Sequence, residues 1–147
     1  MAPNTAELAG KNAFITGGAS GIGAALSAKL TAAGAQVWIA DRQGELGREL
    51  AAALCARGAI AHAVELDVRS YADFQRVVSQ LMESSGRIDY LFNNAGIGIG
   101  GEFDALTLED WTDIIDVNLR GVVHGVQAAY PTMIAQGSGH IVNTASM

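Results

Sequence analysis

Residues 16–23 read Thr-Gly-Gly-Ala-Ser-Gly-Ile-Gly, and this stretch decides how the chain folds. The apolar run 11–16 before it is typical of a β-strand, whereas 21–33 after it carries apolar side chains at helical spacing. The chain is therefore expected to pass from a strand through a tight glycine turn into a helix.

The glycines of this turn have different expected tasks. Gly17 can adopt backbone angles that other residues avoid, Gly21 leaves the backbone open to a ligand, and Gly23 lets the helix pack closely on the strand. The N–H groups and the positive dipole end of the helix then face outward, which suits a pyrophosphate. A glycine cluster alone is equally compatible with a plain tight turn, so the rest of the chain has to decide.

Composition points to one globular domain over residues 1–147, because half of the side chains are hydrophobic. The formal net charge is −6 and the nine basic residues are scattered, which argues against a nucleic-acid or anionic-membrane partner. Cys55 is the only cysteine, so no disulfide can form within the chain and a reducing cytoplasm is the expected setting. No export signal or membrane-spanning run is visible in the sequence, and a soluble protein is expected.

Strand and helix patterns alternate along the whole chain. Strands are expected at 11–16, 36–40, 59–66, 90–93 and 140–144; helices at 21–33, 43–57, from Ser70 to Gly86, and over a long region 107–135 that Pro131 should bend or disturb. This alternation predicts a parallel sheet covered by helices on both faces. Right-handed crossovers give the strand order 3-2-1-4-5, a doubly wound Rossmann-type α/β fold. The reversal between the first and fourth strands opens a crevice at their carboxyl ends, where 16–23 and 93–96 meet.

Asp41 ends the second strand, 18 positions after Gly23 and close to the roughly 20-residue distance at which an acid meets the adenosine ribose. A carboxylate there accepts hydrogen bonds from the ribose hydroxyls and repels a 2′-phosphate, so NAD(H) is favoured over NADP(H). On this basis Asp41→Ala or Asp41→Ser should narrow or invert the preference. Two alternatives stay open: Asp41 as a solvated turn residue, and Arg42 as a partial host for a 2′-phosphate.

Several further segments have the same order as in one known family. They are the Thr-Gly-x-x-x-Gly-x-Gly of 16–23, Asp67-Val68, Asn-Asn-Ala-Gly at 93–96, Asp-Val-Asn-Leu-Arg-Gly at 116–121, and Ile-Val-Asn-Thr-Ala-Ser at 141–146. Together they resemble the short-chain dehydrogenase/reductase family, and the resemblance runs from Lys11 to Met147. Each segment taken alone is compatible with an ordinary turn or surface residue.

The resemblance implies a role for each matching position. Gly17, Ser20, Gly21, Ile22 and Gly23 would contact the pyrophosphate, Asp41 and Arg42 the ribose, Asp67 and Val68 the adenine, and Asn94, Ala95 and Gly96 the remainder of the cofactor. It also implies that Asn118 interrupts a helix and holds a water of the proton relay. Ser146 would be the catalytic serine whose hydroxyl binds the substrate oxygen.

One feature of the family is missing from these residues: the general acid/base tyrosine of Tyr-x-x-x-Lys. No tyrosine is followed by a lysine four residues later, and the only lysines are Lys11 and Lys29. A phenol with an ordinary pKa of about 10 needs a nearby cation to work near neutral pH. The 147 residues alone are therefore expected to be inactive, as the cofactor-binding N-terminal part of a longer enzyme.

The resemblance favours an NAD-dependent oxidoreductase that interconverts a secondary alcohol and a ketone, and it implies a dimer or tetramer. A non-catalytic dinucleotide-binding or regulatory module is the first alternative, because Tyr-x-x-x-Lys is absent. A structural protein that self-associates through helices within 110–135 is the second. His62, His124 and His140 have no mutual ligand spacing, so no metal site is expected.

Overall fold

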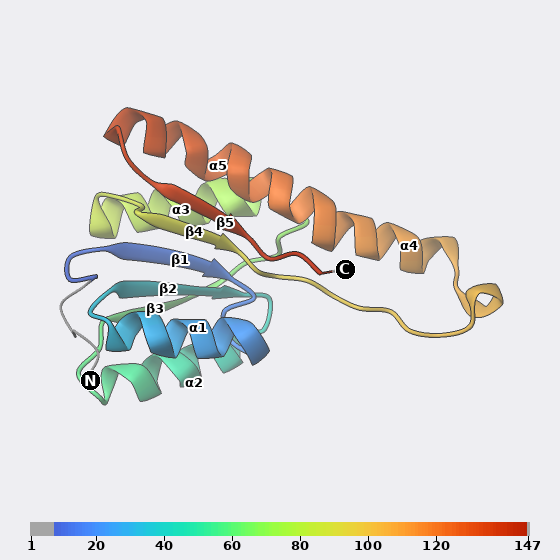
Figure 1. Cartoon of the computed structure of the whole chain (residues 1–147), viewed down its shortest axis with the longest axis horizontal. Coiled ribbons are helices and arrows are strands. Elements are labelled where there is room, and N and C mark those ends of the chain that lie inside the picture. Colours follow the sequence, from blue (N-terminus) through green and yellow to red (C-terminus); the bar gives the residue numbers. More distant parts are fainter. Residues whose placement is uncertain (1–7, 147) are drawn as a thin grey trace.

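The computed structural model of the protein describes residues 8–146 (Figure 1). Strands and helices alternate from the first described residues to the last. The elements are β1 (Asn12–Thr16), α1 (Gly21–Ala32), β2 (Gln36–Asp41), α2 (Gly44–Cys55), β3 (Ala61–Glu65), α3 (Tyr71–Ser85), β4 (Tyr90–Asn93), η1 (Phe103–Ala105), α4 (Leu108–Ile115), η2 (Asp116–Arg120), α5 (Gly121–Gln136) and β5 (His140–Asn143).

The five strands form one parallel sheet in the order β3-β2-β1-β4-β5, which confirms the predicted topology. Helices α1 and α2 cover one face of this sheet, and α3 and α5 cover the other (Figure 1). The direction of strand addition reverses between β1 and β4, so the crevice expected in a doubly wound fold opens at the carboxyl ends of these two strands.

Two apolar clusters fill the spaces between the sheet and its two helical layers. Alternate residues of β1 divide between them: Phe14 packs with Phe74 of α3, whereas Ala13 and Ile15 pack in the cluster that contains Leu54 of α2. All three β1 side chains are fully buried. Strands that are covered on both faces are apolar at successive positions, which explains the continuous apolar runs in the sequence.

The predicted long helical region is divided in the structure. Helix α4 ends at Ile115, a π-helical turn, η2, follows, and α5 begins at Gly121. The α5 helix continues through Pro131 to Gln136, so the chain departs from α-helical hydrogen bonding at η2 rather than at the proline. Pro131 lies on the exposed side of α5, and the carbonyl of Gln127, which loses its helical donor, is also on an exposed residue.

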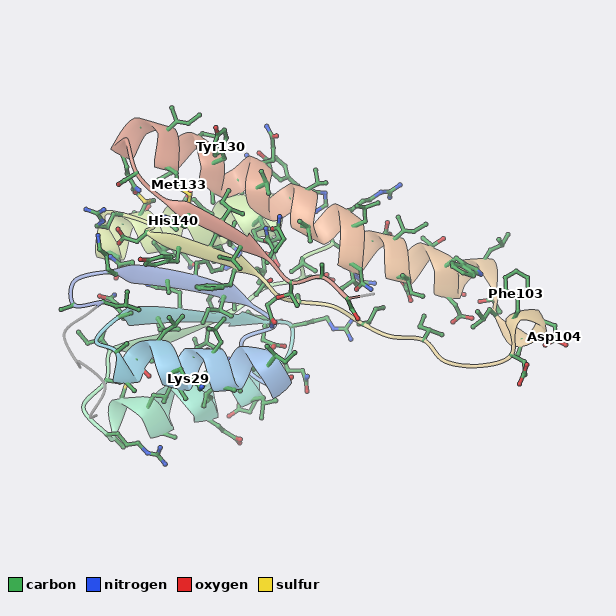
Figure 2. The ribbon with its side chains drawn as sticks, in the orientation of Figure 1. Lys29, Phe103, Asp104, Tyr130, Met133 and His140 are labelled. Carbon is green, nitrogen blue, oxygen red and sulfur yellow. The ribbon has the colours of Figure 1, made fainter. Side chains whose placement is uncertain are left out.

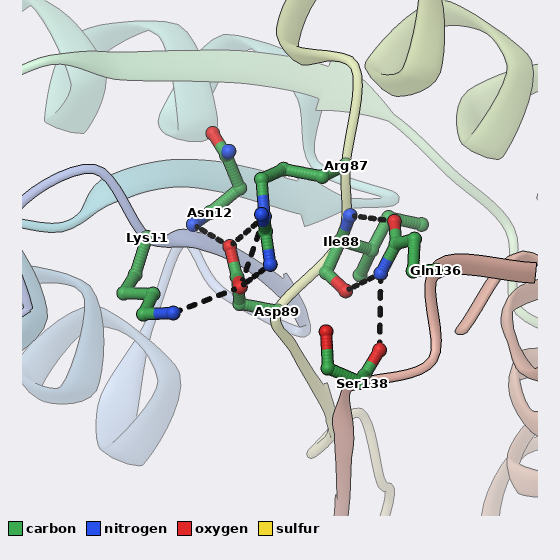
Figure 3. Close-up of polar contacts among 7 residues, drawn as sticks. All are labelled: Lys11, Asn12, Arg87, Ile88, Asp89, Gln136 and Ser138. Atoms are coloured by element: carbon green, nitrogen blue, oxygen red, sulfur yellow. Dashed lines mark hydrogen bonds and ion pairs between the residues drawn. The ribbon is translucent and has the colours of Figure 1, made fainter. Parts of the chain in front are cut away.

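A charged network holds the amino ends of β1 and β4 together (Figure 3). The buried carboxylate of Asp89 accepts the N–H of Asn12 at 2.9 Å and a forked pair of bonds from Arg87, and Lys11 lies 3.4 Å away. Burial raises the pKa of the Asp89 carboxyl, but the hydrogen bonds from Arg87 and Asn12 outweigh it and leave this pKa below its ordinary value.

The end of α5 is attached at the same edge of the sheet. The side-chain amide of Gln136 accepts the N–H of Ile88 and donates to the carbonyl of Ile88, both at 2.9 Å, and it also donates to the carbonyl of Ser138 (Figure 3). One side chain therefore links the lead-in to β4 with the turn that leads into β5.

Candidate functional site

A cavity of about 370 Å³ lies where the carboxyl ends of the strands meet the glycine turn. Eleven of the twelve residues predicted to contact a dinucleotide line it. They are Gly17, Ser20, Gly21, Ile22, Asp41, Arg42, Asp67, Val68, Asn94, Ala95 and Gly96. Gly23, the twelfth, lies behind the turn instead. Folding thus brings residues that are spread over some 80 positions of the sequence together on one concave surface.

The three predicted glycines occupy different environments in this turn. Gly17 has a φ of +61°, and a Cβ there would lie 2.8 Å from the Cα of Ala95. A Cβ on Gly23 would collide with the carbonyl oxygen of Gly17 and lie 2.8 Å from the side chain of Asn94. Gly21 has a φ of +51°, and a Cβ there would meet nothing within 4 Å. Gly17 and Gly23 therefore serve close packing, whereas Gly21 leaves open space beside the cavity.

Thr16, which the sequence reasoning did not single out as a site residue, joins the two turns of the cavity. Its buried hydroxyl accepts the N–H groups of Asn94 and Ala95, both at 3.0 Å. The Asn94 side chain donates in return to the carbonyls of Thr16 and Gly17, at 3.1 and 3.3 Å. The turn after β1 and the turn after β4 are thereby held at a fixed separation.

Asp41 lines the cavity, but its carboxylate is also bonded to the protein. The side chain is buried, and its two oxygens accept the N–H groups of Ala19 at 3.1 Å and Gln43 at 3.0 Å. The reading of Asp41 as a solvated turn residue is therefore wrong. Arg42, next in the chain, is exposed at the rim of the cavity.

Asp67 also has protein partners. Its carboxylate accepts a forked pair of bonds from Arg69, and the same guanidinium lies 3.6 Å from Asp113 of α4. The hydrogen bond from Arg69 holds the pKa of the Asp67 carboxyl below its ordinary value, so the group is ionised at neutral pH. An adenine amine at this position would have to share the carboxylate with Arg69.

Val68 is fixed from the side of α5. Its carbonyl accepts a hydrogen bond from Nδ1 of His124 at 2.9 Å when that nitrogen carries the proton, and a Cβ on Gly121 would lie 2.9 Å from its side chain. His124 itself packs beside the Tyr71 ring, with 5.8 Å between the ring centres. His124 therefore lies next to the cavity wall and supports the backbone of Val68 from outside it.

Asn118 lies in the π-helical turn η2, so the helix interruption expected at this residue is present. Its side chain makes two hydrogen bonds of 2.8 Å with the backbone of Ile97, accepting the N–H and donating to the carbonyl. The side chain therefore anchors the glycine-rich loop that follows β4. Both polar atoms of the Asn118 side chain are thus engaged with the backbone of Ile97.

Ser146 is exposed beyond the end of β5. Thr144, two residues earlier, lines the cavity and donates from its hydroxyl to Oδ1 of Asn94 at 3.3 Å. Within residues 8–146, neither Asn118 nor Ser146 is part of the cavity wall. The structure brings the predicted binding residues together more closely than the predicted catalytic pair.

The sequence reasoning missed five residues of the cavity wall: Gln43, Leu66, Ile97, Val117 and Thr144. All five adjoin segments that it had singled out, such as Thr144 within 141–146 and Val117 next to Asn118. Their positions beside or within those segments were the signal that could have identified them.

In the described residues, no group of three or more His, Cys, Asp or Glu side chains could hold a metal ion.

A family model described as short chain dehydrogenase matches residues 11–147. The chain belongs to the short-chain dehydrogenase family. The match covers the glycine turn, Asp41, residues 93–96 and residues 141–146.

Relatives of the chain include 2,5-dichloro-2,5-cyclohexadiene-1,4-diol dehydrogenase LinX of Sphingobium indicum, which is 36% identical over 141 residues; these are 96% of this chain and 56% of LinX. A solved metagenomic short-chain oxidoreductase in complex with NADP is 34% identical with a TM-score of 0.90, over 97% of this chain and 65% of that one. A solved enzyme from Burkholderia phymatum in complex with NAD is 38% identical with a TM-score of 0.91, over 95% and 50%. The chain thus spans about half the length of the curated relatives it matches.

Across residues 8–146, no helix combines the length and the apolar character that a membrane span requires.

Proposed function

We propose that this chain binds NAD(H) and forms the cofactor-binding domain, over residues 1–147, of an oxidoreductase that interconverts a secondary alcohol and a ketone. The observation that carries the proposal is the 370 Å³ cavity, whose wall combines an open glycine turn with a buried carboxylate at the end of β2. The open space at Gly21 gives a phosphate access to the backbone at the start of α1.

The preference for NAD(H) over NADP(H) rests on Asp41. Its buried carboxylate forms part of the cavity wall, and a 2′-phosphate placed beside it would bring like charges together in a desolvated setting. Arg42 is exposed beside it and offers the opposite charge. Solved relatives are described in complex with NADP and with NAD, so family membership alone does not choose between the two.

The remaining wall residues receive roles in this proposal. Ser20 and Ile22 flank Gly21 and would border the pyrophosphate, whereas Asp67 and Val68 would border the adenine. Asn94, Ala95 and Gly96 would border the nicotinamide half, on the side of Thr144.

Catalysis would divide between cofactor and protein. When bound, the nicotinamide would exchange a hydride with the substrate carbon. Ser146 would hold the substrate oxygen with its hydroxyl, and Asn118 would keep the loop at Ile97 and the turn η2 in place. Neither side chain can take the proton of an alcohol at neutral pH, so we expect the 147-residue chain to bind the cofactor without turnover.

Fluorescence titration measures the affinities of the chain for NADH and NADPH. We expect NADH to bind about tenfold more tightly than NADPH, because a desolvated contact between like charges costs more than about 1 kcal/mol. Arg42→Ala should weaken NADPH further and leave NADH nearly unchanged, with Glu49→Ala, an exposed carboxylate of α2, as the control. Equal affinities for the two cofactors in the unmodified chain would contradict the proposed preference.

A non-catalytic dinucleotide-binding module is the second candidate, because the residues that line the cavity account for cofactor binding alone. Both candidates predict NADH binding. They differ in the full-length gene product, which we expect to oxidise at least one member of a panel of secondary alcohols. A full-length product that binds NADH tightly but converts no alcohol or ketone would favour the module.

We further propose a cytoplasmic homo-oligomer, dimer or tetramer. Exposed apolar side chains recur at steps of three or four residues along α4 to α5, except for one step of seven between Val123 and Tyr130; they include Leu119, Val123 and Ile134. Figure 2 shows that this helical line extends away from the sheet toward Phe103 and Asp104. An apolar row of this length on a surface helix is typical of an interface. A cytoplasmic setting agrees with the single cysteine, Cys55.

Light scattering after gel filtration measures the oligomer. Val123→Asp and Ile134→Asp should each shift the mass toward that of the monomer, because a buried unpaired charge opposes association. Ile60→Asp is the matched control, since Ile60 is equally exposed but lies before β3. A monomeric unmodified chain would contradict the proposal.

A further inference from the structure

The carboxylate of Asp41 connects two segments that are far apart in the sequence. One oxygen accepts the N–H of Ala19, in the glycine turn, at 3.1 Å, and the other accepts the N–H of Gln43 at 3.0 Å. Asp41 is only 8% exposed and Ala19 only 5%. The bond to the turn is therefore shielded from water, which strengthens it.

These two N–H groups mark the starts of two helices. Ala19 directly precedes Ser20, the N-cap of α1, and Gln43 is the N-cap of α2. The first N–H groups of a helix lack intrahelical partners, and the helix dipole favours a negative charge beside them. Asp41 thus binds the N–H of the α2 N-cap and the N–H of the residue just before the α1 N-cap, which places its negative charge close to the start of both helices.

Neither helix has a cap of its own that would replace this charge. The side chains of Ser20 and Gln43 make no capping hydrogen bond. The first turn of α1 has no acidic residue, and Glu45 in the first turn of α2 is paired with Arg48 at 2.6 Å. By contrast, α3 and α4 begin with capping side chains, from Ser70 and Thr107.

The glycine turn is thereby attached to the end of β2 at two successive residues. The N–H of Gly18 donates to the carbonyl of Ala40 at 3.2 Å, and the N–H of Ala19 donates to the side chain of Asp41. Gly17, on the other side, is held against the turn after β4. The bond to Asp41 is the one attachment of this turn to β2 that depends on a side chain among the hydrogen bonds of residues 8–146.

We propose that Asp41 is a positioning residue: its charge holds the glycine turn in the conformation that receives the pyrophosphate, in addition to any contact with the ribose. The part of this inference that concerns the cofactor rests on the proposed function. Asp41→Ala should then lower the affinity for NADH, whereas for NADPH the lost support of the turn opposes the relief of the like-charge contact. The preference should therefore narrow, one of the two outcomes that the sequence alone predicts, mainly because NADH binds less tightly.

Amide hydrogen exchange of the ligand-free chain tests the turn directly. In Asp41→Ala the amide of Ala19 should exchange at least about tenfold faster, as expected when a hydrogen bond to a charged group is lost. The amide of Leu91, in the core strand β4, serves as the reference for global unfolding, and Glu49→Ala is the matched charge control. An Ala19 amide that stays as protected as in the wild type, relative to Leu91, overturns the proposal.

A cofactor analogue separates the turn from the ribose. The analogue is NADH whose adenosine ribose lacks the 2′ and 3′ hydroxyls, so it offers Asp41 nothing to bond. Asp41→Ala should lower the affinity for this analogue by about tenfold, and Asp41→Asn, which keeps one acceptor, by less. If the analogue binds Asp41→Ala and the wild type equally well, Asp41 acts on the ribose alone and the proposal is wrong. A wild-type chain that binds no dinucleotide would refute the proposed function, while Ala19 exchange would still decide how the turn is held.

Discussion

Thr16 and Asn94 are hydrogen-bonded to each other in both directions. The N–H of Asn94 donates to the Thr16 hydroxyl at 3.0 Å, and the Asn94 side chain donates back to the Thr16 carbonyl at 3.1 Å. Because Thr16 ends β1 and Asn94 follows β4, this reciprocal contact spans the point at which the strand order reverses. The width of the cavity depends on it.

Thr16→Val should lower the free energy of unfolding by about 1–3 kcal/mol, since two N–H groups lose a buried acceptor. NADH affinity should fall as well, because the two turns are no longer held together. Thr16→Ser keeps the hydroxyl and should retain most of both properties. Urea unfolding and NADH titration measure the two effects, and a Val variant as stable as the Ser variant would contradict this role.

Gly125 should not tolerate even a methyl group. A Cβ there would collide with Oδ1 of Asn93, a buried side chain whose amide nitrogen is bonded to Asn143 at 2.9 Å. We expect Gly125→Ala to destabilise the protein by about 1–3 kcal/mol, the usual cost of overpacking. In an Asn93→Ala background the same substitution should cost less, because the colliding atom is gone. Gly98→Ala, in open space, is the control for thermal unfolding.

Gly21→Ala should affect binding more than stability. Its φ of +51° costs an alanine about 1–2 kcal/mol, and the new methyl group would project into space beside the cavity. Gly58→Ala is a matched control, with a φ of +86° and equally open surroundings but no place in the cavity wall. We expect a similar loss of stability in both variants and at least about a tenfold loss of NADH affinity in Gly21→Ala alone. Equal NADH affinities would show that the phosphates do not approach Gly21.

Asp89 should make stability depend on pH in the acid range. Its pKa is lower in the folded than in the unfolded chain, so the folded state binds fewer protons. The stabilisation is therefore complete above the unfolded value of about 3.9 and is lost as pH falls through the folded value. Asp89→Asn should cost about 1–3 kcal/mol at pH 7.

The difference in the free energy of unfolding between Asp89→Asn and the wild type should then shrink as pH falls below about 4. Urea unfolding at a series of pH values measures it. Glu49→Gln, an exposed carboxylate, should stay within about 0.5 kcal/mol of the wild type throughout. A gap between Asp89→Asn and the wild type that is independent of pH would show that the Asp89 network matters for packing rather than for its charge.

Local sequence patterns predicted the elements because burial imposes its period on the side chains. The strand expected at 11–16 is Asn12–Thr16, and the one expected at 59–66 is Ala61–Glu65. The strand order followed from the handedness of crossovers, and it placed the two turns of the cavity at one edge.

Contacts between distant residues could not be predicted in the same way. The bonds from Asp41 to Ala19 and from Thr16 to Asn94 join residues 22 and 78 positions apart, and no periodic pattern records them. The hydrogen bond from the Arg69 side chain to the Asp67 carboxylate likewise depends on side-chain conformations, which no sequence pattern specifies. The disturbance expected at Pro131 does not end α5, because the exposed side of this helix tolerates a carbonyl without a donor, and the π-helical turn η2 was not predicted from the sequence pattern.

The network around Asp89 and Gln136 (Figure 3) lies at the amino ends of the strands. The cavity lies at their carboxyl ends. A directed-evolution library confined to Lys11, Arg87 and Gln136 would therefore search for heat resistance without touching any residue of the cavity wall. Conversely, stabilising substitutions at the amino ends of the strands would allow the cavity wall to accept more destabilising substitutions in a library aimed at new ligands.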